Sequence, residues 1–156
     1  MVESGAKWGI VMALFMGEYR HNLDSKNRII VPAKIRDALG DKFYLTKGYD
    51  GCISLYTEEK FEKMVMDLQK SPYTMASART YMRELMSKSS ECEVDSQGRI
   101  QLPQVLVKDA ALQKACVIIG VVDHVEIWAS DRWDVYHEQS AAAFEATAES
   151  LTEFVR

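Results

Sequence analysis

Long apolar runs, low-complexity segments and targeting signals are all missing from this chain of 156 residues. Its apolar stretches fall short of the ~18 residues that cross a membrane as a helix, so we expect no membrane partner. The segment from Trp8 to Met16 is apolar, but it lacks the basic start and the small-residue cleavage site of a signal peptide. Hydrophobic residues make up 47% and charged residues 27%, which favours a compact, ordered core over disorder.

Cysteine is scarce as well. The chain has 3 cysteines, Cys52, Cys92 and Cys116, which are widely spaced and lie in strand-like stretches. An odd number at such spacings favours buried, reduced thiols over disulfides or metal ligands. We therefore expect a protein of the reducing cytoplasm.

The chain also lacks the common catalytic motifs, including HExxH, CxxC, GxGxxG, GxxxxGK[ST] and GxSxG. Of the three histidines, His21 is expected on the apolar side of a strand, His124 in a turn and His137 at the start of an exposed helix. No partner is visible in the sequence for any of them. These absences predict a protein that is not an enzyme and that has no metal, no cofactor and no catalytic residues.

One ten-residue stretch, by contrast, is written twice. Residues 23–32 read LDSKNRIIVP, and residues 94–103 read VDSQGRIQLP, 71 positions later. The similarity continues through strand-like segments and ends near Glu59-Lys60-Phe61 and Asp131-Arg132-Trp133. The chain therefore consists of two similar halves joined by a connecting segment.

Asn27 in the first copy corresponds to Gly98 in the second, and these two residue types tolerate a positive φ best. An aspartate, two ordinary residues and a left-handed residue describe a three-residue hairpin loop. Such a loop would place Asp24 opposite Arg28 in the first copy, and Asp95 opposite Arg99 in the second. An ion pair of this kind keeps the carboxylate ionised and makes it unsuitable as a general acid.

Hydrophobic periodicity predicts strands and helices throughout both halves. The helical expectations include Ser130 as the N-cap of a short helix and inward-facing residues at Ala78, Met82, Leu85 and Met86. Thr57 is the expected N-cap of the first connecting helix. The strands are expected near residues 17–23, 28–31, 43–47, 52–56, 115–121 and 125–128. The helices are expected near 32–39, 57–70, 74–88, 130–133 and 138–154, with a further short helix that begins at Pro103.

The net charge of −4 does not favour nucleic acid, but the charges are unevenly distributed. From residue 17 to 36, five basic residues stand against two acidic ones, whereas residues 137–156 hold four glutamates and one arginine. The basic residues of the first segment are Arg20, Lys26, Arg28, Lys34 and Arg36. The positive charge therefore gathers around the first repeated motif.

The two Asp-x-x-x-Arg motifs, each followed by Ile-x-[Val/Leu]-Pro, and the opening FMGEYR at residues 15–20 resemble the MraZ family. Members of that family are bacterial transcriptional regulators built from two AbrB-like units. The resemblance covers about residues 15–140. It implies an α+β fold that is mainly β: two AbrB-like swapped-hairpin repeats form a pseudo-dimeric double-split β-barrel, with connecting and C-terminal helices.

On this resemblance the chain divides into five segments. Residues 1–14 form an N-terminal extension that we expect to be loosely ordered. The first AbrB-like domain spans 15–60, a helical connector 61–88, the second AbrB-like domain 89–134 and a C-terminal helix 135–156.

The resemblance also implies a function. In this family the motif arginines bind short direct repeats in the promoter DNA, and the proteins assemble into ring-shaped homo-oligomers at the nucleoid. Arg28 and Arg99 are thus the expected reading residues, oriented by Asp24 and Asp95. We expect further contacts to the DNA from Lys26, Lys34 and Arg20, and a repressor of its own division and cell-wall operon.

The neighbours of the two arginines in the sequence predict unequal roles. Arg28 stands among basic residues, whereas Arg99 follows Glu91, Glu93 and Gln97, which attract phosphate less. The first motif is therefore expected to bear more of the readout.

Two other functions stay open at this point. One is an AbrB-like antitoxin that binds a toxin as well as DNA, although such proteins usually have one unit and an unfolded tail. The other is a structural ring protein in which the arginines only fix the turns. A gel-shift assay with the upstream DNA distinguishes these functions.

Overall fold

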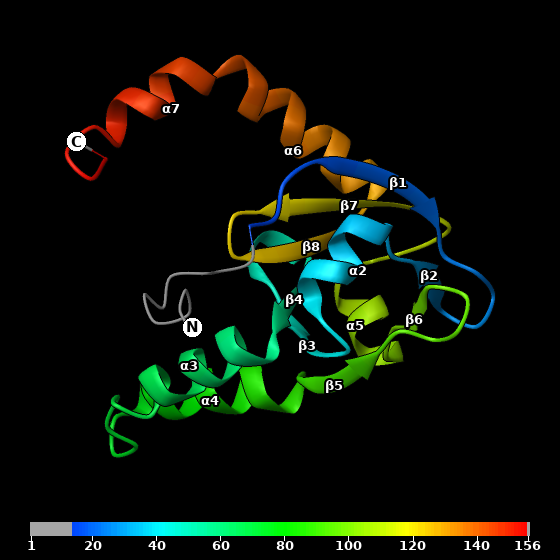
Figure 1. The fold of residues 1–156 in the computed structure, drawn as a ribbon. Helices are drawn as coiled ribbons and strands as arrows, with labels where there is room; N and C mark the ends of the chain where they lie inside the picture. Colours follow the sequence, from blue (N-terminus) through cyan, green and yellow to red (C-terminus); the bar gives the residue numbers. More distant parts are fainter. Residues whose placement is uncertain (1–13, 156) are drawn as a thin grey trace, which may run out of the picture.

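The computed structural model describes residues 14–155, which form an α+β fold dominated by antiparallel strands (Figure 1). All but the last residue of the expected extension 1–14 lies outside the described residues. The strands are β1 (Glu18–Asn22), β2 (Arg28–Ile30), β3 (Lys42–Lys47), β4 (Ile53–Thr57), β5 (Ser90–Glu93), β6 (Arg99–Gln101), β7 (Ala115–Val121) and β8 (His124–Ala129). The helices are α2 (Ala33–Leu39), the 3-10 turn η1 (Tyr49–Gly51), α3 (Glu58–Leu68), α4 (Ala76–Ser87), α5 (Gln104–Asp109), α6 (Ser130–Ala142) and α7 (Phe144–Ser150).

The strands of the two halves are interleaved. Six of them form one sheet in the order β1-β7-β8-β4-β3-β5, and β2 pairs with β6 in a separate two-stranded ribbon. The first strand of each half therefore pairs with the other half, β1 with β7 and β5 with β3. The local pairing expected across each repeated turn is wrong, because β1 does not pair with β2 and β5 does not pair with β6. The expected hairpins β3–β4 and β7–β8 do form.

The strand register repeats between the halves. In the pair β1–β7, Arg20 lies opposite Val117, and in β5–β3 the equivalent residue Glu91 lies opposite Tyr44. In the ribbon, Ile29 lies opposite Ile100, so a pseudo-twofold axis passes between these two residues. The ribbon contacts both edge strands of the sheet, β1 and β5. This arrangement confirms the expected fold class of two interlocked repeats.

The core lies between the sheet and the short helices that follow the ribbon strands. Strand alternation places Ile29 and Ile100 inward, each 1% exposed, while their neighbours in β2 and β6 face outward. Phe43, Leu45 and Leu55 are fully buried at the centre. Burial of this kind contributes ~1.5–3 kcal/mol per large side chain, so the ribbon is held firmly on the core.

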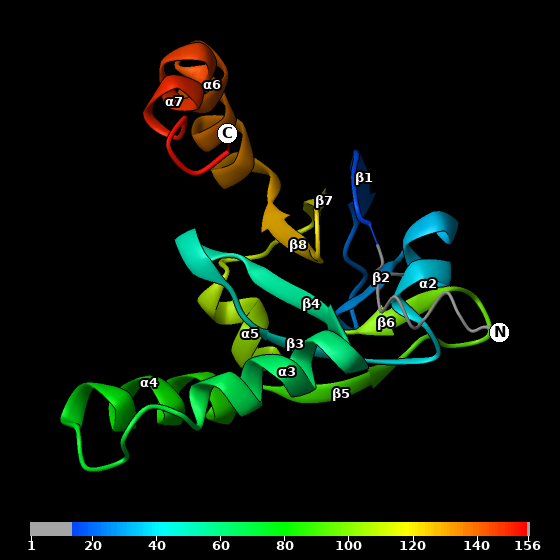
Figure 2. The same ribbon diagram turned by 60° about the vertical axis from the view of Figure 1, so that its left-hand side comes forward.

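Two helical arms leave the body on one side, as Figures 1 and 2 show. In the first arm, α3 begins at Glu58, directly after the expected N-cap Thr57, whose side chain accepts a hydrogen bond from the Lys60 N–H at 3.1 Å. Helix α4 then returns to the sheet, with Ala78 and Leu85 buried. The inward position expected for Met86 is wrong, because this side chain is 44% exposed.

The second arm is the C-terminal pair α6–α7. The expected short helix at 130–133 and long helix at 138–154 are wrong: α6 runs without interruption from Ser130 to Ala142, and α7 follows. Ser130 is the first helical residue and not the N-cap. Trp128 of β8 packs against Trp133 and Tyr136, with ring centroids 5.3 and 5.0 Å apart, which attaches the start of α6 to the sheet.

All three cysteines are buried and unpaired, as the sequence predicts. Burial raises the pKa of the Cys52 thiol to about 12, and the pKa values of Cys92 and Cys116 to about 11. These thiols are therefore protonated and chemically quiet at neutral pH. Over residues 14–155, no helix has the length and apolar character to cross a membrane.

Candidate nucleic-acid interface

The first repeated motif forms a tight turn between β1 and β2. Asp24 Oδ1 accepts hydrogen bonds from the backbone N–H groups of Lys26 (2.9 Å) and Arg28 (2.8 Å). Its Oδ2 accepts one from Arg28 Nε at 2.7 Å. Asn27 completes the turn with a φ of 59°, the left-handed conformation that its residue type predicts. The carboxylate of Asp24 thus organises the whole loop.

The second motif repeats this network between β5 and β6. Asp95 Oδ1 accepts from the N–H groups of Gln97 (2.8 Å) and Arg99 (2.9 Å), and Oδ2 accepts from Arg99 Nε at 2.9 Å. Gly98 has a φ of 78°. In both turns the hydrogen bond from the arginine N–H is the main reason why the pKa of the aspartate is lowered. Both carboxylates are therefore ionised at neutral pH and bind their arginines as anions.

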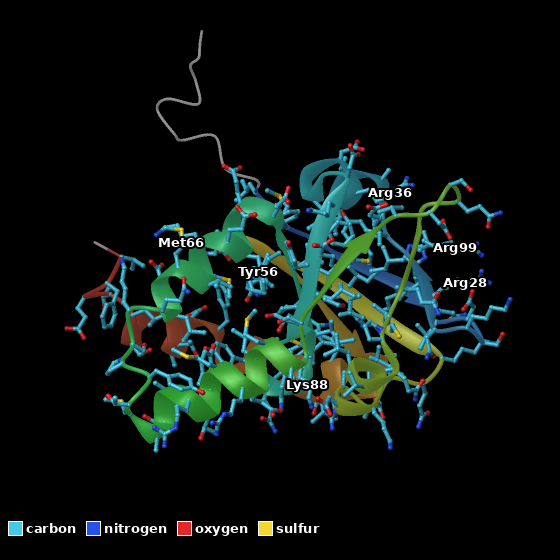
Figure 3. All side chains as sticks on the ribbon, turned by 90° about the horizontal axis from the view of Figure 1, so that it is seen from below. Arg28, Arg36, Tyr56, Met66, Lys88 and Arg99 are labelled. Atoms are coloured by element: carbon cyan, nitrogen blue, oxygen red, sulfur yellow. The ribbon has the colours of Figure 1, made fainter. Side chains whose placement is uncertain are left out.

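Of its three side-chain nitrogens, each arginine uses only Nε to bind the aspartate. Over residues 14–155, no hydrogen bond engages the two terminal nitrogens of Arg28 or Arg99. The side chains are partly exposed, at 29% and 25%, and they lie near each other on the side of the molecule away from Met66 (Figure 3). The arrangement fixes the guanidinium groups and leaves their outer edges available for a bidentate contact.

The outer face of the β2–β6 ribbon consists of four side chains. Arg28 lies opposite Gln101, and Ile30 lies opposite Arg99. Because directly opposed residues share a face, all four project to the side away from the core. The ribbon therefore presents two oriented cations, one apolar side chain and one amide on a narrow two-stranded surface.

Because the two halves exchange strands, the side chains next to each turn differ from those that the sequence suggests. The sequence places Arg36 of α2 with the first turn, but its guanidinium lies against Gly98 of the second turn, so closely that a Cβ at Gly98 would collide with it. The first turn instead meets α5, where Asn27 Nδ2 donates to Gln104 Oε1 at 2.7 Å. The sequence neighbours on which the ranking of Arg28 above Arg99 rests are therefore not all spatial neighbours, since Arg36 adjoins the second turn.

The other expected contact residues lie in different places. Lys26 is exposed at the first turn, and Lys34 is exposed in the first helical turn of α2. Arg20, by contrast, lies on β1, where it pairs with Glu18 at 3.1 Å and with Asp134 of α6 at 2.9 Å. Its guanidinium fastens α6 to β1.

Comparison with known proteins identifies the family of this chain. The sequence model described as "MraZ protein, putative antitoxin-like" matches the chain twice, over residues 14–84 and 85–155. The chain belongs to the MraZ family. The two matches coincide with the two halves that the strand swap interlocks.

Several proteins named transcriptional regulator MraZ are close relatives of this chain. The one from Ligilactobacillus salivarius is 47% identical over 141 residues, which cover 90% of this chain and 99% of the relative. The one from Natranaerobius thermophilus is 48% identical over 141 residues, with the same coverage. The one from Desulforamulus reducens is 45% identical over 142 residues, covering 91% of this chain and all of the relative.

A polar cluster around His124 is not apparent from the sequence pattern. His124 lies in β8, not in a turn, and its two ring nitrogens bond Asp123 and Glu126, each at 2.9 Å. Lys60 of α3 pairs with Asp123 at 3.0 Å, and the Tyr56 ring stacks on the imidazole at 5.2 Å. The only indication in the sequence is that His124 and Glu126 are two residues apart, which places them on one face of a strand. The cluster joins α3 to the sheet.

The His124 cluster predicts a pH-dependent stability. The pKa of His124 is raised, chiefly by the hydrogen bond to Glu126. Because the folded protein binds the proton more tightly than the unfolded chain, protonated His124 stabilises the fold. This contribution is complete below the pKa of histidine in the unfolded chain, about 6.5, and is lost as the pH rises through the pKa of His124 in the folded protein. We expect His124→Gln to lower the free energy of unfolding by about 1–3 kcal/mol at pH 6 and by less at pH 9.

Urea unfolding at both pH values measures this effect. His137→Gln is the matched control, because His137 lies on the exposed part of α6. An equal loss at pH 6 and pH 9 would mean that the imidazolium charge does not stabilise the cluster.

Proposed function

We propose that this chain is a sequence-specific DNA-binding transcriptional regulator that represses its own division and cell-wall operon by reading direct repeats in the promoter. The observation that carries the proposal is the duplicated Asp-x-x-x-Arg turn, in which a carboxylate binds the Nε of each partly exposed arginine and leaves its outer nitrogens available. The relatives named transcriptional regulator MraZ support the same function. This function belongs in the cytoplasm, at the nucleoid.

A two-stranded ribbon fits the major groove of B-DNA, which is ~12 Å wide. There Arg28 and Arg99 would each donate two hydrogen bonds to guanine O6 and N7, the commonest specific contact between a protein and a base. Lys26 and Lys34 would bind phosphates, which supply affinity without sequence information. Arg20 contributes least to this proposal, because Glu18 and Asp134 already neutralise it.

Fluorescence anisotropy with labelled DNA from upstream of the protein's own coding sequence tests the proposal. We expect binding that resists an excess of unrelated duplex DNA and weakens steeply with salt. Equal competition by unrelated DNA would contradict sequence-specific reading. A toxin partner in place of DNA, or assembly without any DNA binding, would instead support the antitoxin or the structural ring protein.

We further propose self-association into a ring through the two helical arms. The arms lie on the side of the body away from the turns, so assembly would leave Arg28 and Arg99 accessible (Figure 3). Both arms expose large apolar side chains, which single proteins seldom display in groups. These are Met66, Tyr73, Met75 and Tyr81 on the first arm, and Val135, Phe144, Leu151 and Phe154 on the second.

Charge complementarity suggests which surfaces meet. The first arm carries Arg79 and Arg83, which reach Tyr73 at its tip, and the second carries Glu145, Glu149 and Glu153. The second arm of one copy would therefore bind the first arm of the next, a head-to-tail contact that closes into a ring when the rotation permits.

Deleting residues 144–156 should convert the ring to smaller species. Linked binding sites raise apparent affinity ~10²–10⁴-fold, so binding to a promoter with several repeats should fall by a similar factor. Light scattering measures the mass, and anisotropy with one repeat is the control, because a single site gains nothing from linkage. A truncated protein of unchanged mass would show that α7 is not part of the interface.

A further inference from the structure

The outer face of the ribbon is not symmetric, although the fold around it is. The pseudo-twofold axis between Ile29 and Ile100 relates Arg28 to Arg99, and these are identical. The same axis relates Ile30 to Gln101. The four outward positions therefore hold one identical pair and one pair of opposite chemistry.

Ile30 is an unusual residue for such a surface. It is 46% exposed, lies directly opposite Arg99 and is separated by one residue from Arg28. A β-branched apolar side chain between two fixed guanidinium groups gains nothing from water. It would gain by contact with another apolar group, and the thymine methyl is the apolar group of the major groove.

Gln101 occupies the equivalent place at the other end of the ribbon. Its Nε2 donates to the Lys26 carbonyl at 3.2 Å, which fixes the amide against the first turn. The second N–H of that nitrogen and Oε1 stay available, and together they match the N7 and N6 groups of adenine. Ile30 cannot make the corresponding bond to the second turn.

The difference extends to the turns themselves. Lys26 and the Asn27–Gln104 bond belong to the end that carries Gln101. Gln97 and the Arg36–Gly98 contact belong to the end with Ile30. Each end therefore has its own chemistry beyond the shared arginine.

We infer that Ile30 and Gln101 are specificity-determining residues that give the reading face a direction: Ile30 contacts a thymine methyl, and Gln101 contacts the edge of an adenine. The inference rests on the proposed DNA binding. A face with two equivalent ends would bind a site equally well in either orientation. A face with two different ends binds its site in one orientation only. Direct repeats require this, because every copy of the box points the same way along the DNA.

The first step of the test is selection of preferred boxes from random duplex DNA by the full-length protein. The selected box should be non-palindromic. Ile30 and Gln101 face dyad-related positions on opposite strands, so one strand of the box should carry thymine at both ends and the other strand adenine at both ends. Gln101→Ile should give both ends the same chemistry and shift the selected box towards a palindrome.

Modified bases then test each contact separately. Replacing the thymine of the selected box by uracil removes its methyl group, and should weaken binding of the wild-type protein about fourfold. Ile30→Ala should be insensitive to this change, whereas the conservative variant Ile30→Val should keep the sensitivity. Replacing the adenine by 7-deazaadenine should cost the wild type about tenfold and leave Gln101→Ala unaffected.

The outcomes separate this inference from the function on which it rests. If the wild type selects no preferred sequence, both fail. If it selects a box but Ile30→Ala and Gln101→Ala select that same box and keep the same sensitivity to the modified bases, the inference fails and the DNA-binding function stands. Circular dichroism checks folding, which exposed side chains affect little.

Discussion

Replacing Arg28 and Arg99 together by alanine should lower the affinity for promoter DNA by roughly 30- to 10⁴-fold. Each bidentate contact between an arginine and a guanine contributes ~1–3 kcal/mol of discrimination, and the double variant loses both. Because Arg36 adjoins the second turn, we expect the two single variants to lose similar amounts of affinity. Anisotropy titration with promoter DNA and with unrelated DNA measures the loss and the remaining preference.

Lys26→Ala is the matched control for this experiment. It removes a charge at the same turn without removing a guanidinium, so it should weaken binding to all sequences alike. The slope of log affinity against log salt should fall by ~0.9 for each phosphate that the lysine no longer neutralises. Arg28→Lys separates charge from geometry, since lysine keeps the cation but cannot donate in a planar fork.

The arginine variants must be folded for this comparison to count, because Asp24 and Asp95 also organise their turns. Circular dichroism and the elution volume provide that check. A well-folded double variant that binds promoter DNA with the affinity of the wild type would show that the two motifs only stabilise the turns.

The second large effect concerns the interlocked halves. A fragment of residues 14–88 should not fold as a monomer, because β1 and β2 have their partners β7 and β6 in the other half. Without them, Ile29 and the strand edges are exposed. We expect an unfolded chain at low concentration and, as the concentration rises, a homodimer in which two first halves pair with each other.

Circular dichroism and sedimentation over a concentration series measure this behaviour. Mixing the fragment with residues 89–155 is the control and should restore the native spectrum, since it supplies both missing strands. A fragment that is folded and monomeric at all concentrations would mean that β1 and β2 can pair locally, as a simple hairpin.

The local chemistry of the turns could be predicted from the sequence. Asn27 and Gly98 adopt the positive φ that their residue types favour, and Asp24 accepts from the arginine four residues on. Strand β7 has the bounds that its apolar pattern indicates. These features depend on neighbours in the chain, which is why a single sequence contains them.

The pairing of strands between the halves follows from non-local contacts, and periodicity does not encode them. For this reason the position of Arg36 in the sequence indicates the wrong turn. The length of α6 could not be predicted for a related reason. Trp133 and Tyr136 pack on Trp128, and this tertiary contact carries the helix through a stretch where the sequence pattern is weak.

The interleaving of strands also has a consequence for synthesis. Strand β1 is complete at Asn22, whereas its partner β7 begins only at Ala115. At translation rates of ~5–20 residues per second, the emerging β1 waits roughly 5–20 s without a partner. During that interval its open edge can pair with the same segment of a chain leaving the next ribosome on the message. Slower translation between the two halves should therefore increase the fraction of nascent chains that exchange strands with a neighbouring chain.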